Sequence, residues 1–393
     1  MGDILKTVTE IRDNALAQGQ QYLLDLTLKF DKISLESFVY EVPKQVAVAP
    51  ELAQAIEIAA ENIYKFHQAE CDKISANEVV ETFAGIRCFK KFTPIANVGI
   101  YVPNGLFSTL LMTIIPAKIS GCKNIVICTP PNPSAALLYV CKVLDIEKIY
   151  TIGGAQAVFA MAYGIGEIPK VDKIFGPGNE YVDAAKRLVA TEIAIDMPAG
   201  PSEVLVIADD KTDKKAVIYD LLAQLEHGKE SRAWLFTTSQ ELIDEVTKDI
   251  AIEAQKFPRS KILEMSLKNL SYGCFADVKT AIVAANEIAP EHLIINVEMA
   301  ETYQDLVENA GSVFVGKYTT ESLGDYASGT NHVLPTAGFA KSYSGLSTLS
   351  FGKFITFQQA SKEAVQRIGK HVAVMAEAEN LQLHAQSILV RVE

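Results

Sequence analysis

Residues 98–105 read Val98-Gly99-Ile100-Tyr101-Val102-Pro103-Asn104-Gly105, a short apolar run that ends in a Pro/Gly turn. Three similar runs follow, at residues 124–128, 149–152 and 173–175, and helical stretches separate them. Such alternation predicts a parallel sheet with helices on both faces. Ligands of open α/β sheets bind at the carboxyl ends of the strands, where this sequence places Gly- and Pro-containing turns.

A second block with the same alternation begins near Ser202. Its expected strands are residues 203–208, 233–237, 273–276, 292–297 and 312–315, with helices at 214–227, 240–255, 278–289 and 300–309. Ahead of both blocks, apolar spacings of three and four predict a helix near residues 4–15 and another from Pro50. Residues 79–98 alternate like strands, and residues 358–384 predict a helical tail that ends in a strand-like segment at 388–392. We therefore expect an α/β fold with two Rossmann-like parallel sheets and a C-terminal helical tail.

The composition indicates a folded protein whose acidity excludes one class of partner. About half of the 393 residues are hydrophobic, and the formal net charge is -12. An acidic chain repels polyphosphate, so we expect no nucleic-acid partner. No apolar run is long enough to span a bilayer, and the first residues lack a signal-peptide pattern. We therefore expect a cytoplasmic protein with no membrane partner.

The six cysteines favour structural thiols. No two of them form a Cys-x-x-Cys pair, and two of them sit in apolar stretches. The alternative is a catalytic thiolate, as in aldehyde dehydrogenases, but no cysteine lies in a motif that supports it. The cysteines are Cys71, Cys88, Cys122, Cys128, Cys141 and Cys274.

Two pairs of residues have a spacing that suits metal or proton chemistry. Gln224 and His227 stand at i and i+3 of an expected helix, so their side chains share one face. An amide oxygen and a ring nitrogen can both ligate zinc, although a solvated polar face has the same spacing. Glu291 and His292 open an expected strand, where a carboxylate and an imidazole can form a general acid/base pair. An ordinary helix-to-strand turn is the alternative.

Three turns are further candidates. Residues 324–336 place Asp325 and His332 on a loop with two glycines and a proline, a setting frequent in active sites and also found in surface turns. The turns at residues 153–157 and 176–179 lie between a strand and a helix, where backbone N–H groups attract anions. Neither matches Gly-x-Gly-x-x-Gly, so structural turns are as compatible with the pattern as a dinucleotide site.

Taken together, these stretches resemble the histidinol dehydrogenase family over nearly the whole chain. The order and the spacing of the motifs both fit that family. The motifs are Val98–Pro103, Gly153–Ala157, Val171–Asn179, Asp196–Glu203, Ala289–Leu293 and Gly324–Thr336.

The resemblance implies a set of ligands and partners. The zinc ligands would be Gln224, His227, Asp325 and His384, the last from the partner subunit of a homodimer whose tails are swapped and whose active site is shared. The substrate would be L-histidinol. Its contacts would be the four zinc ligands together with Ser202, His292, His332 and Glu379, and those of NAD would be Tyr101, Gln156 and Asn179.

The resemblance also implies a mechanism and a division of the chain. L-Histidinol would be oxidised to L-histidine through the aldehyde, in the last steps of histidine biosynthesis, with two NAD consumed. His292 would take the hydroxyl proton, Glu291 would activate the water that hydrates the aldehyde, and zinc would position the substrate. Residues 1–94 with 202–350 would carry the zinc and catalytic residues, 95–201 would bind NAD, and 351–393 would form the dimerisation tail.

The sequence departs from the family pattern near the expected cofactor. Asn104 stands where the family usually has Gly, the loop after it is shorter, and Leu225 stands where Ala is usual. Two other functions compete with this interpretation. A relative on the same scaffold could oxidise another small alcohol, such as a sulfonated diol, and a non-catalytic binding protein could keep the fold without the acid/base pair.

Overall fold

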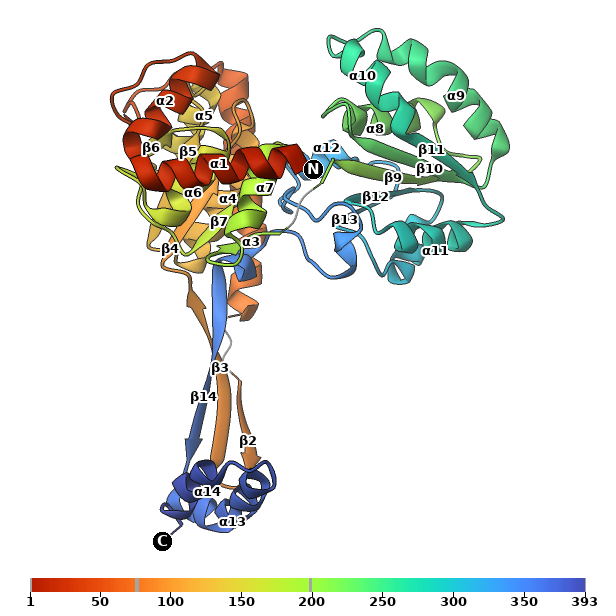
Figure 1. Cartoon of the computed structure of the whole chain (residues 1–393). Coiled ribbons are helices and arrows are strands. Elements are labelled where there is room, and N and C mark those ends of the chain that lie inside the picture. Colours follow the sequence, from red (N-terminus) through yellow and green to blue (C-terminus); the bar gives the residue numbers. More distant parts are fainter. Residues whose placement is uncertain (1, 75–77, 198–199, 393) are drawn as a thin grey trace. The chain divides into compact units, whose positions relative to one another are not determined.

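The computed structural model describes residues 2–74, 78–197 and 200–392. The chain forms two compact units. The first consists of Met1–Gln68 and Ile95–Phe351, and the second of Ala69–Pro94 and Gly352–Glu393. Two sheets lie in the first unit and one in the second (Figure 1).

The first sheet has six strands in the order β1-β6-β5-β4-β7-β8. Neighbouring strands are parallel except for β1, which pairs with β6 in the antiparallel sense. The strands are β1 Val39–Glu41, β4 Asn97–Tyr101, β5 Asn124–Thr129, β6 Lys148–Thr151, β7 Lys173–Phe175 and β8 Ala194–Ile195.

Helices cover both faces of this sheet. Alternate residues of a strand point to opposite faces, so the strands contribute to two hydrophobic cores. Tyr101 of β4 enters one hydrophobic core and Ile100 enters the other. The first core contains side chains of α1 Gly2–Gln18, α2 Gln20–Asp31, α6 Gly154–Tyr163 and α7 Glu180–Val189. The second core contains side chains of α3 Pro50–Ile74, α4 Phe107–Ser120 and α5 Ala135–Val143.

The second sheet has five parallel strands in the order β11-β10-β9-β12-β13. They are β9 Glu203–Ala208, β10 Arg232–Thr237, β11 Leu270–Cys274, β12 His292–Asn296 and β13 Ser312–Val315. One face packs against α8 Lys214–Leu225, α9 Gln240–Ala254 and α10 Ser260–Ser266, and the other against α11 Val278–Ile288 (Figure 1). Shorter segments are η1 Leu267–Asn269, η2 Ala300–Leu306, α12 Glu321–Tyr326, η3 Phe339–Lys341 and η4 Thr348–Phe351.

The parallel strands of both sheets have the same order. When they are numbered along the chain, each sheet reads 3-2-1-4-5. The direction of the order reverses between β4 and β7 in the first sheet and between β9 and β12 in the second. In such folds the crevice at this reversal, at the carboxyl ends of the strands, is the usual ligand site.

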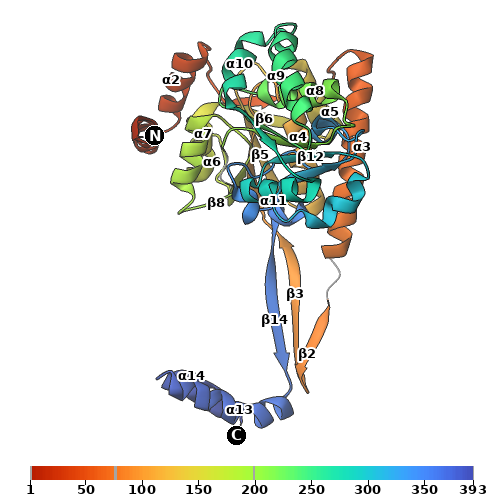
Figure 2. The same ribbon diagram turned by 90° about the vertical axis from the view of Figure 1, so that its right-hand side faces the viewer.

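The second unit is a three-stranded antiparallel sheet followed by two helices (Figure 2). The sheet has the order β14-β3-β2, and Ser361 caps the helix that follows β14. Every side chain of β2 is exposed, as are those of β14 from its second residue onward. The elements are β2 Val79–Phe83, β3 Ile86–Pro94, β14 Gly352–Ala360, α13 Lys362–Ala378 and α14 Gln382–Leu389.

The expected α/β fold with parallel sheets and covering helices is confirmed, but two local predictions are wrong. Residues 358–360 end strand β14, so the helical tail begins at Lys362. Residues 388–392 continue α14 as helix and turn, with hydrogen bonds such as Val392 N–H to the Leu389 carbonyl, 3.0 Å. A short apolar run does not distinguish a strand from a helix end, and here packing decides. Gly369 of α13 leaves room for Val392, whose Cγ2 would lie 2.4 Å from an added Cβ.

The grouping of the N-terminal residues also differs from the expectation. We expected residues 1–94 to join residues 202–350, yet β1 pairs with β6 and the α1 and α2 side chains lie in a core of the first sheet. Residues 69–94 join the C-terminal residues in the second unit. The edge pairing spans three residues, and hydrophobic periodicity carries no information on such a long-range partner.

Candidate active site

Glu291 and His292 lie at the amino-terminal edge of the second sheet. Helix α11 ends at Ile288, and the left-handed backbone of the capping residue Ala289 (φ 53°) turns the chain into β12. His292 is the first residue of β12 and lies beside Val204 of β9. The pair does lie at a helix-to-strand turn, as the sequence also allowed, and both side chains are buried there.

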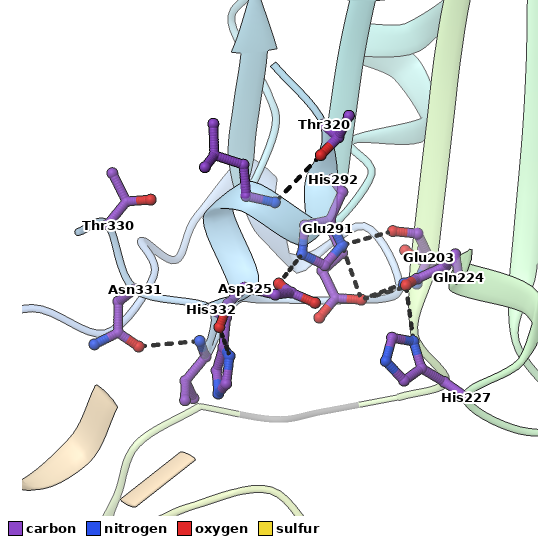
Figure 3. A network of polar contacts seen from close by, with 12 residues as sticks. Glu203, Gln224, His227, Glu291, His292, Thr320, Asp325, Thr330, Asn331 and His332 are labelled. Atoms are coloured by element: carbon purple, nitrogen blue, oxygen red, sulfur yellow. Dashed lines mark hydrogen bonds and ion pairs between the residues drawn. The ribbon is translucent and has the colours of Figure 1, made fainter. Parts of the chain in front are cut away.

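The backbone of Glu203 holds the Glu291 carboxylate (Figure 3). Glu291 Oε2 accepts a hydrogen bond from Glu203 N–H over 2.8 Å and another from Gln224 Nε2 over 3.3 Å. Burial raises the pKa of Glu291 to about 7, although the neighbouring His292 and the Glu203 N–H favour the charged form. This carboxyl can therefore take up and release a proton near neutral pH.

Glu203 also orients His292, through its backbone carbonyl group. Its Nδ1 lies 3.1 Å from the Glu203 carbonyl oxygen. A carbonyl only accepts, so Nδ1 carries the proton that points at it, and in the neutral ring Nε2 keeps a lone pair. None of the described residues gives this buried Nε2 a hydrogen bond, and its neighbour is Asp325 Oδ1 at 3.6 Å. In its neutral form the ring thus presents a basic nitrogen toward Asp325.

Acids around His292 set its charge. Burial alone would lower the pKa of His292, but Glu321, Glu291 and Asp325 raise it to about 10. The isolated site therefore favours the imidazolium form, and a bound cation beside these acids would shift the balance toward the neutral base. The charge of the site therefore favours a positively charged ligand.

Helix α12 supplies two of these acids, one turn apart. Thr320 caps the helix by accepting a hydrogen bond from Leu323 N–H over 3.3 Å. Glu321 is buried, none of the described residues bonds its Oε2, and burial raises its pKa to about 8. Burial would also raise the pKa of Asp325, but the side chains of His292, His332 and His227 lower it overall.

Glu321 was missed by the sequence analysis. Its carboxylate, that of Asp325 and the His292 ring offer ligand atoms that lie within 4.8 Å of one another, so these residues could hold a metal ion. The set shares only Asp325 with the predicted zinc ligands. The signal in the sequence was an acid pair at i and i+4 after a Thr cap, which places both carboxylates on one helix face.

Gln224 lies in the last turn of α8, and His227 follows two residues after the helix ends. Gln224 joins the site through its hydrogen bond to Glu291. Gln224 is fully buried, so the solvated helix face that its spacing also allowed is wrong for this residue. Its Oε1 lies 3.0 Å from His227 Nδ1. Two ligands of one tetrahedral zinc lie about 3.4 Å apart, so these atoms are close to the required spacing. Removal of the His227 ring from water lowers its pKa, which favours the neutral ring that can bind a metal.

His332 connects the loop after α12 to the first sheet. Its Nδ1 lies 2.9 Å from the Asp325 carbonyl oxygen, and its Nε2 lies 3.2 Å from Thr109 Oγ1 in α4. Burial lowers the pKa of His332. Ser202 immediately precedes Glu203 at the same edge of the second sheet. Ser202 is therefore next to the residue whose backbone holds the acid/base pair, and His332 contacts Asp325, which lies beside His292.

The three predicted NAD contacts lie at the carboxyl edge of the first sheet. Tyr101 ends β4, and its hydroxyl accepts a hydrogen bond from Gly154 N–H over 3.1 Å. Gln156 lies in the first turn of α6. Asn179 caps α7, accepting from Tyr181 N–H and Val182 N–H over 3.1 Å each. These are the loops that the strand order assigns to a ligand.

The remaining predicted residues, Glu379 and His384, belong to the second unit. Glu379 directly follows the last residue of α13, His384 lies in α14, and both are exposed. Their assignment to the zinc and substrate sites stays a prediction.

The buried cysteines do not suit a catalytic thiolate. Burial raises the pKa of Cys122 to about 11 and that of Cys141 to about 12, and it raises that of Cys128 as well. A thiolate is the nucleophilic form, so these three thiols are inert at neutral pH.

The opposite edge of the second sheet is hollowed but chemically different. A cavity of about 830 Å³ lies where β9, β12 and β13 end, and its lining includes Asp209, Asn296 and Glu298. The acid/base pair lies at the other ends of these strands, so the cavity is separate from the candidate site.

Comparison with known proteins gives a consistent result. A family model described as histidinol dehydrogenase matches residues 1–392. The chain is 44% identical over 400 residues to histidinol dehydrogenase of Pasteurella multocida (strain Pm70), covering 99% of this chain and 92% of that protein. The same identity holds over 405 residues for that of Bacteroides fragilis (strain YCH46), covering 100% and 94%.

Solved structures agree. The crystal structure of histidinol dehydrogenase from Elizabethkingia anophelis has a TM-score of 0.94 at 43% identity, covering 98% of this chain and 92% of that one. A putative aldehyde dehydrogenase from Burkholderia cenocepacia has a TM-score of 0.52 at 13% identity over 91% and 86% of the chains, a likeness of fold alone. Among the described residues, no helix is both long and apolar enough to cross a membrane.

Proposed function

The chain belongs to the histidinol dehydrogenase family, and we propose that it oxidises L-histidinol to L-histidine through the aldehyde at the Glu291–His292 site. It is an NAD-dependent oxidoreductase. The observation that carries the assignment of the site is the His292 ring. Its Nδ1 is held by the Glu203 carbonyl, while its buried Nε2 faces Asp325 Oδ1 at 3.6 Å and has no hydrogen bond among the described residues.

His292 acts as the base of the alcohol step. Its Nε2 takes the hydroxyl proton as the C–H bond releases a hydride and the C=O bond forms. NAD, when bound, accepts one hydride in each of the two oxidations. The Glu203 carbonyl fixes the ring tautomer, so the lone pair stays at the nitrogen that faces the site.

Glu291 activates water for the second oxidation. The aldehyde has no hydroxyl proton to lose until water adds to it and gives a gem-diol. A carboxyl whose pKa lies at about 7 can take the proton of that water, and its Gln224 and Glu203 contacts hold it in place. The diol then transfers a hydroxyl proton to a neutral His292 and the second hydride to NAD, and the carboxylic acid that forms ionises to the carboxylate.

The proposed zinc ligands are Gln224, His227, Asp325 and His384 from a second copy of the chain. An amide oxygen, two imidazoles and a carboxylate form a donor set that suits zinc. Zinc, when bound, supplies a positive charge that anchors the imidazole and amine of histidinol and offsets the surrounding acids, which lowers the pKa of His292. Ser202, His332 and Glu379 complete the proposed substrate contacts.

The proposed NAD site is the crevice of the first sheet, with Tyr101, Gln156 and Asn179. Its loops begin two helices with backbone N–H groups, which favour the pyrophosphate. The shorter loop after Asn104 follows β4 at the same edge of the sheet. The expected cytoplasmic location stays a prediction from the sequence.

A homodimer is supported by the surface of the second unit. Large apolar side chains remain exposed on its sheet, among them Val80 at 51%, Phe354 at 46% and Ile355 at 40%. Adjacent residues of a strand point to opposite faces, so apolar surface is open on both sides of β14. Exposed apolar surface of this kind marks an interface, and a second copy of the chain is its proposed occupant.

Mixed dimers test the shared site. An inactive His292→Ala chain and an inactive His384→Ala chain, unfolded and refolded together, should regain about a quarter of wild-type activity, because half the dimers are mixed and each has one intact site. Each chain refolded alone is the control. Recovery no greater than in the controls contradicts the exchange of His384 between subunits.

The decisive measurement of the reaction is the NADH formed per L-histidinol. Two NADH per substrate, lost on chelation and restored by zinc, are expected, while thiol alkylation has little direct effect. One NADH with release of the aldehyde would refute the second step at this site. No NADH from a folded, zinc-loaded protein would redirect the search to other small alcohols.

A further inference from the structure

A buried ion pair lies behind the turn that follows β7. Lys186 Nζ is 2.5 Å from Asp196 Oδ1, and the two side chains are 4% and 2% exposed. Lys186 belongs to α7, the helix after the turn, and Asp196 directly follows the edge strand β8. The pair therefore ties the helix to the sheet.

This ion pair also holds both backbone groups of Gly176. The Gly176 N–H donates to Asp196 Oδ2 over 2.8 Å, and the Gly176 carbonyl accepts from Lys186 Nζ over 2.9 Å. The Met197 N–H donates to Asp196 Oδ1 over 2.8 Å. One carboxylate and one ammonium thus fix the two peptide groups that flank Gly176.

The turn at Gly176 needs this restraint. Its φ of 114° is open to glycine alone, and an added Cβ would lie 2.0 Å from the Tyr101 carbonyl oxygen. The turn therefore presses against the end of β4 at the point where the strand order reverses. Glycine has several accessible backbone states, so an unrestrained turn would leave this conformation easily.

We propose that Lys186 and Asp196 are positioning residues for NAD, which hold residues 176–179 in the form that presents Asn179 and the start of α7 to the cofactor. The inference rests on the proposed NAD site. With so little exposed surface, neither side chain contacts the cofactor; each acts through the backbone of the turn.

The test is a comparison of two buried lysines. Lys186→Met keeps the aliphatic volume and removes the ammonium. Its dissociation constant for NADH, from fluorescence titration, should rise at least about tenfold, and the KM for NAD should rise with it, because an unpaired buried carboxylate reorganises the turn. The KM for histidinol and the zinc content should stay at wild-type values.

Lys173→Met is the matched control. Lys173 is also partly buried beside Asp196, but its Nζ donates to the Ser350 carbonyl over 2.9 Å and not to the turn. This variant should lose thermal stability and keep its NADH dissociation constant within about twofold of wild type. An equal loss of NADH affinity in both variants would reduce Lys186 to a general structural role and overturn the proposal.

Two further variants distinguish a failure of the proposed NAD site from a failure of the positioning role. Asn179→Ala tests the cofactor site itself, and unchanged NADH affinity there refutes the proposed NAD contact. Weakened binding in Asn179→Ala with wild-type binding in a folded Lys186→Met refutes the positioning role alone. If Lys186→Met does not fold, Asp196→Asn replaces it, since the amide keeps an acceptor for Gly176; NADH binding should weaken about threefold, and wild-type affinity contradicts the proposal.

Discussion

The two parallel sheets have one strand order but opposite chemistry at the carboxyl ends of their strands. In the first, the crevice between β4 and β7 is bordered by glycine turns and by Asn179 at the start of a helix. In the second, Asp209 fills the corresponding turn. Its carboxylate accepts from Lys211 N–H over 3.0 Å, Glu298 N–H over 2.9 Å and Thr212 Oγ1 over 2.9 Å.

This difference shows that strand order offers a ligand site and that turn chemistry decides its use. A phosphate needs free backbone N–H groups, and at the second crevice a carboxylate of the chain already occupies them. The second sheet instead concentrates its reactive residues at the amino-terminal edge, where Glu291 and His292 lie close to Asp325. One sheet offers the crevice proposed for the cofactor, and the other offers the proposed acid/base groups.

The largest expected effect tests the proposed base at the amino-terminal edge of the second sheet. His292→Ala removes the proposed base and should lower kcat for histidinol oxidation by about 10³-fold. NADH affinity should be unchanged, because the first sheet is intact. Steady-state rates and NADH titration of the folded variant measure both, and near-normal turnover would remove His292 from the mechanism.

Glu291→Gln should separate the alcohol step from the aldehyde step at the amino-terminal edge. Oxidation of supplied histidinaldehyde should fall by about 10²-fold, since hydration loses its base, while the alcohol step should fall much less. Rapid-mixing measurements of each step give the ratio. Equal slowing of the two steps would show that Glu291 does not act on water specifically.

A pair of variants compares the two crevices directly. Asn179→Ala should weaken NADH binding by about tenfold, because the proposed site loses a polar contact and the cap of α7. Asp209→Ala should leave NADH binding unchanged and lower the free energy of unfolding by about 1 to 2 kcal/mol, from lost hydrogen bonds. A measurable NADH effect in Asp209→Ala would mean that the second crevice takes part in cofactor binding.

The smallest effect concerns Asp220, a carboxyl that folding removes from water. Burial raises the pKa of Asp220 to about 6 from 3.8, so folding favours its protonated form. Both states are protonated below about pH 4 and the folded carboxylate carries its full cost above about pH 6, so wild-type stability falls between these values.

Asp220→Asn removes that cost. In chelator-treated protein the variant should be more stable by about 1 kcal/mol at pH 7.5, with the difference gone near pH 4. Denaturant unfolding at several pH values measures it. A difference that does not change with pH would assign the effect to altered packing instead.

The sequence predicted the parts of this comparison that depend on local pattern. Apolar runs alternating with helical stretches predicted both parallel sheets, and adjacency along the chain sufficed for Glu291 with His292. What it could not provide were contacts between distant segments. Glu203 approaches the pair only because β9 and β12 are neighbours, and Glu321 reaches His292 only through the packing of α12.

The same limit explains the errors in domain grouping. The pairing of β1 with β6 joins residues 39–41 to residues 148–150, and three residues carry too little pattern to specify a partner. The second unit likewise depends on β3 pairing with β14, more than 250 positions apart, along nine matched residues. Burial, the main signal in sequence periodicity, is weak there because the strands are largely exposed.

The main chain of Glu203 aligns both members of the acid/base pair. Its main-chain N–H holds Glu291 and its main-chain carbonyl holds His292. A side-chain replacement at position 203 leaves these two atoms in the chain, and proline alone among the standard amino acids lacks the N–H. The alignment of the proton carriers thus depends on the peptide backbone at position 203, while the buried Glu203 side chain has a separate role and accepts a hydrogen bond from Ala337 N–H over 3.1 Å.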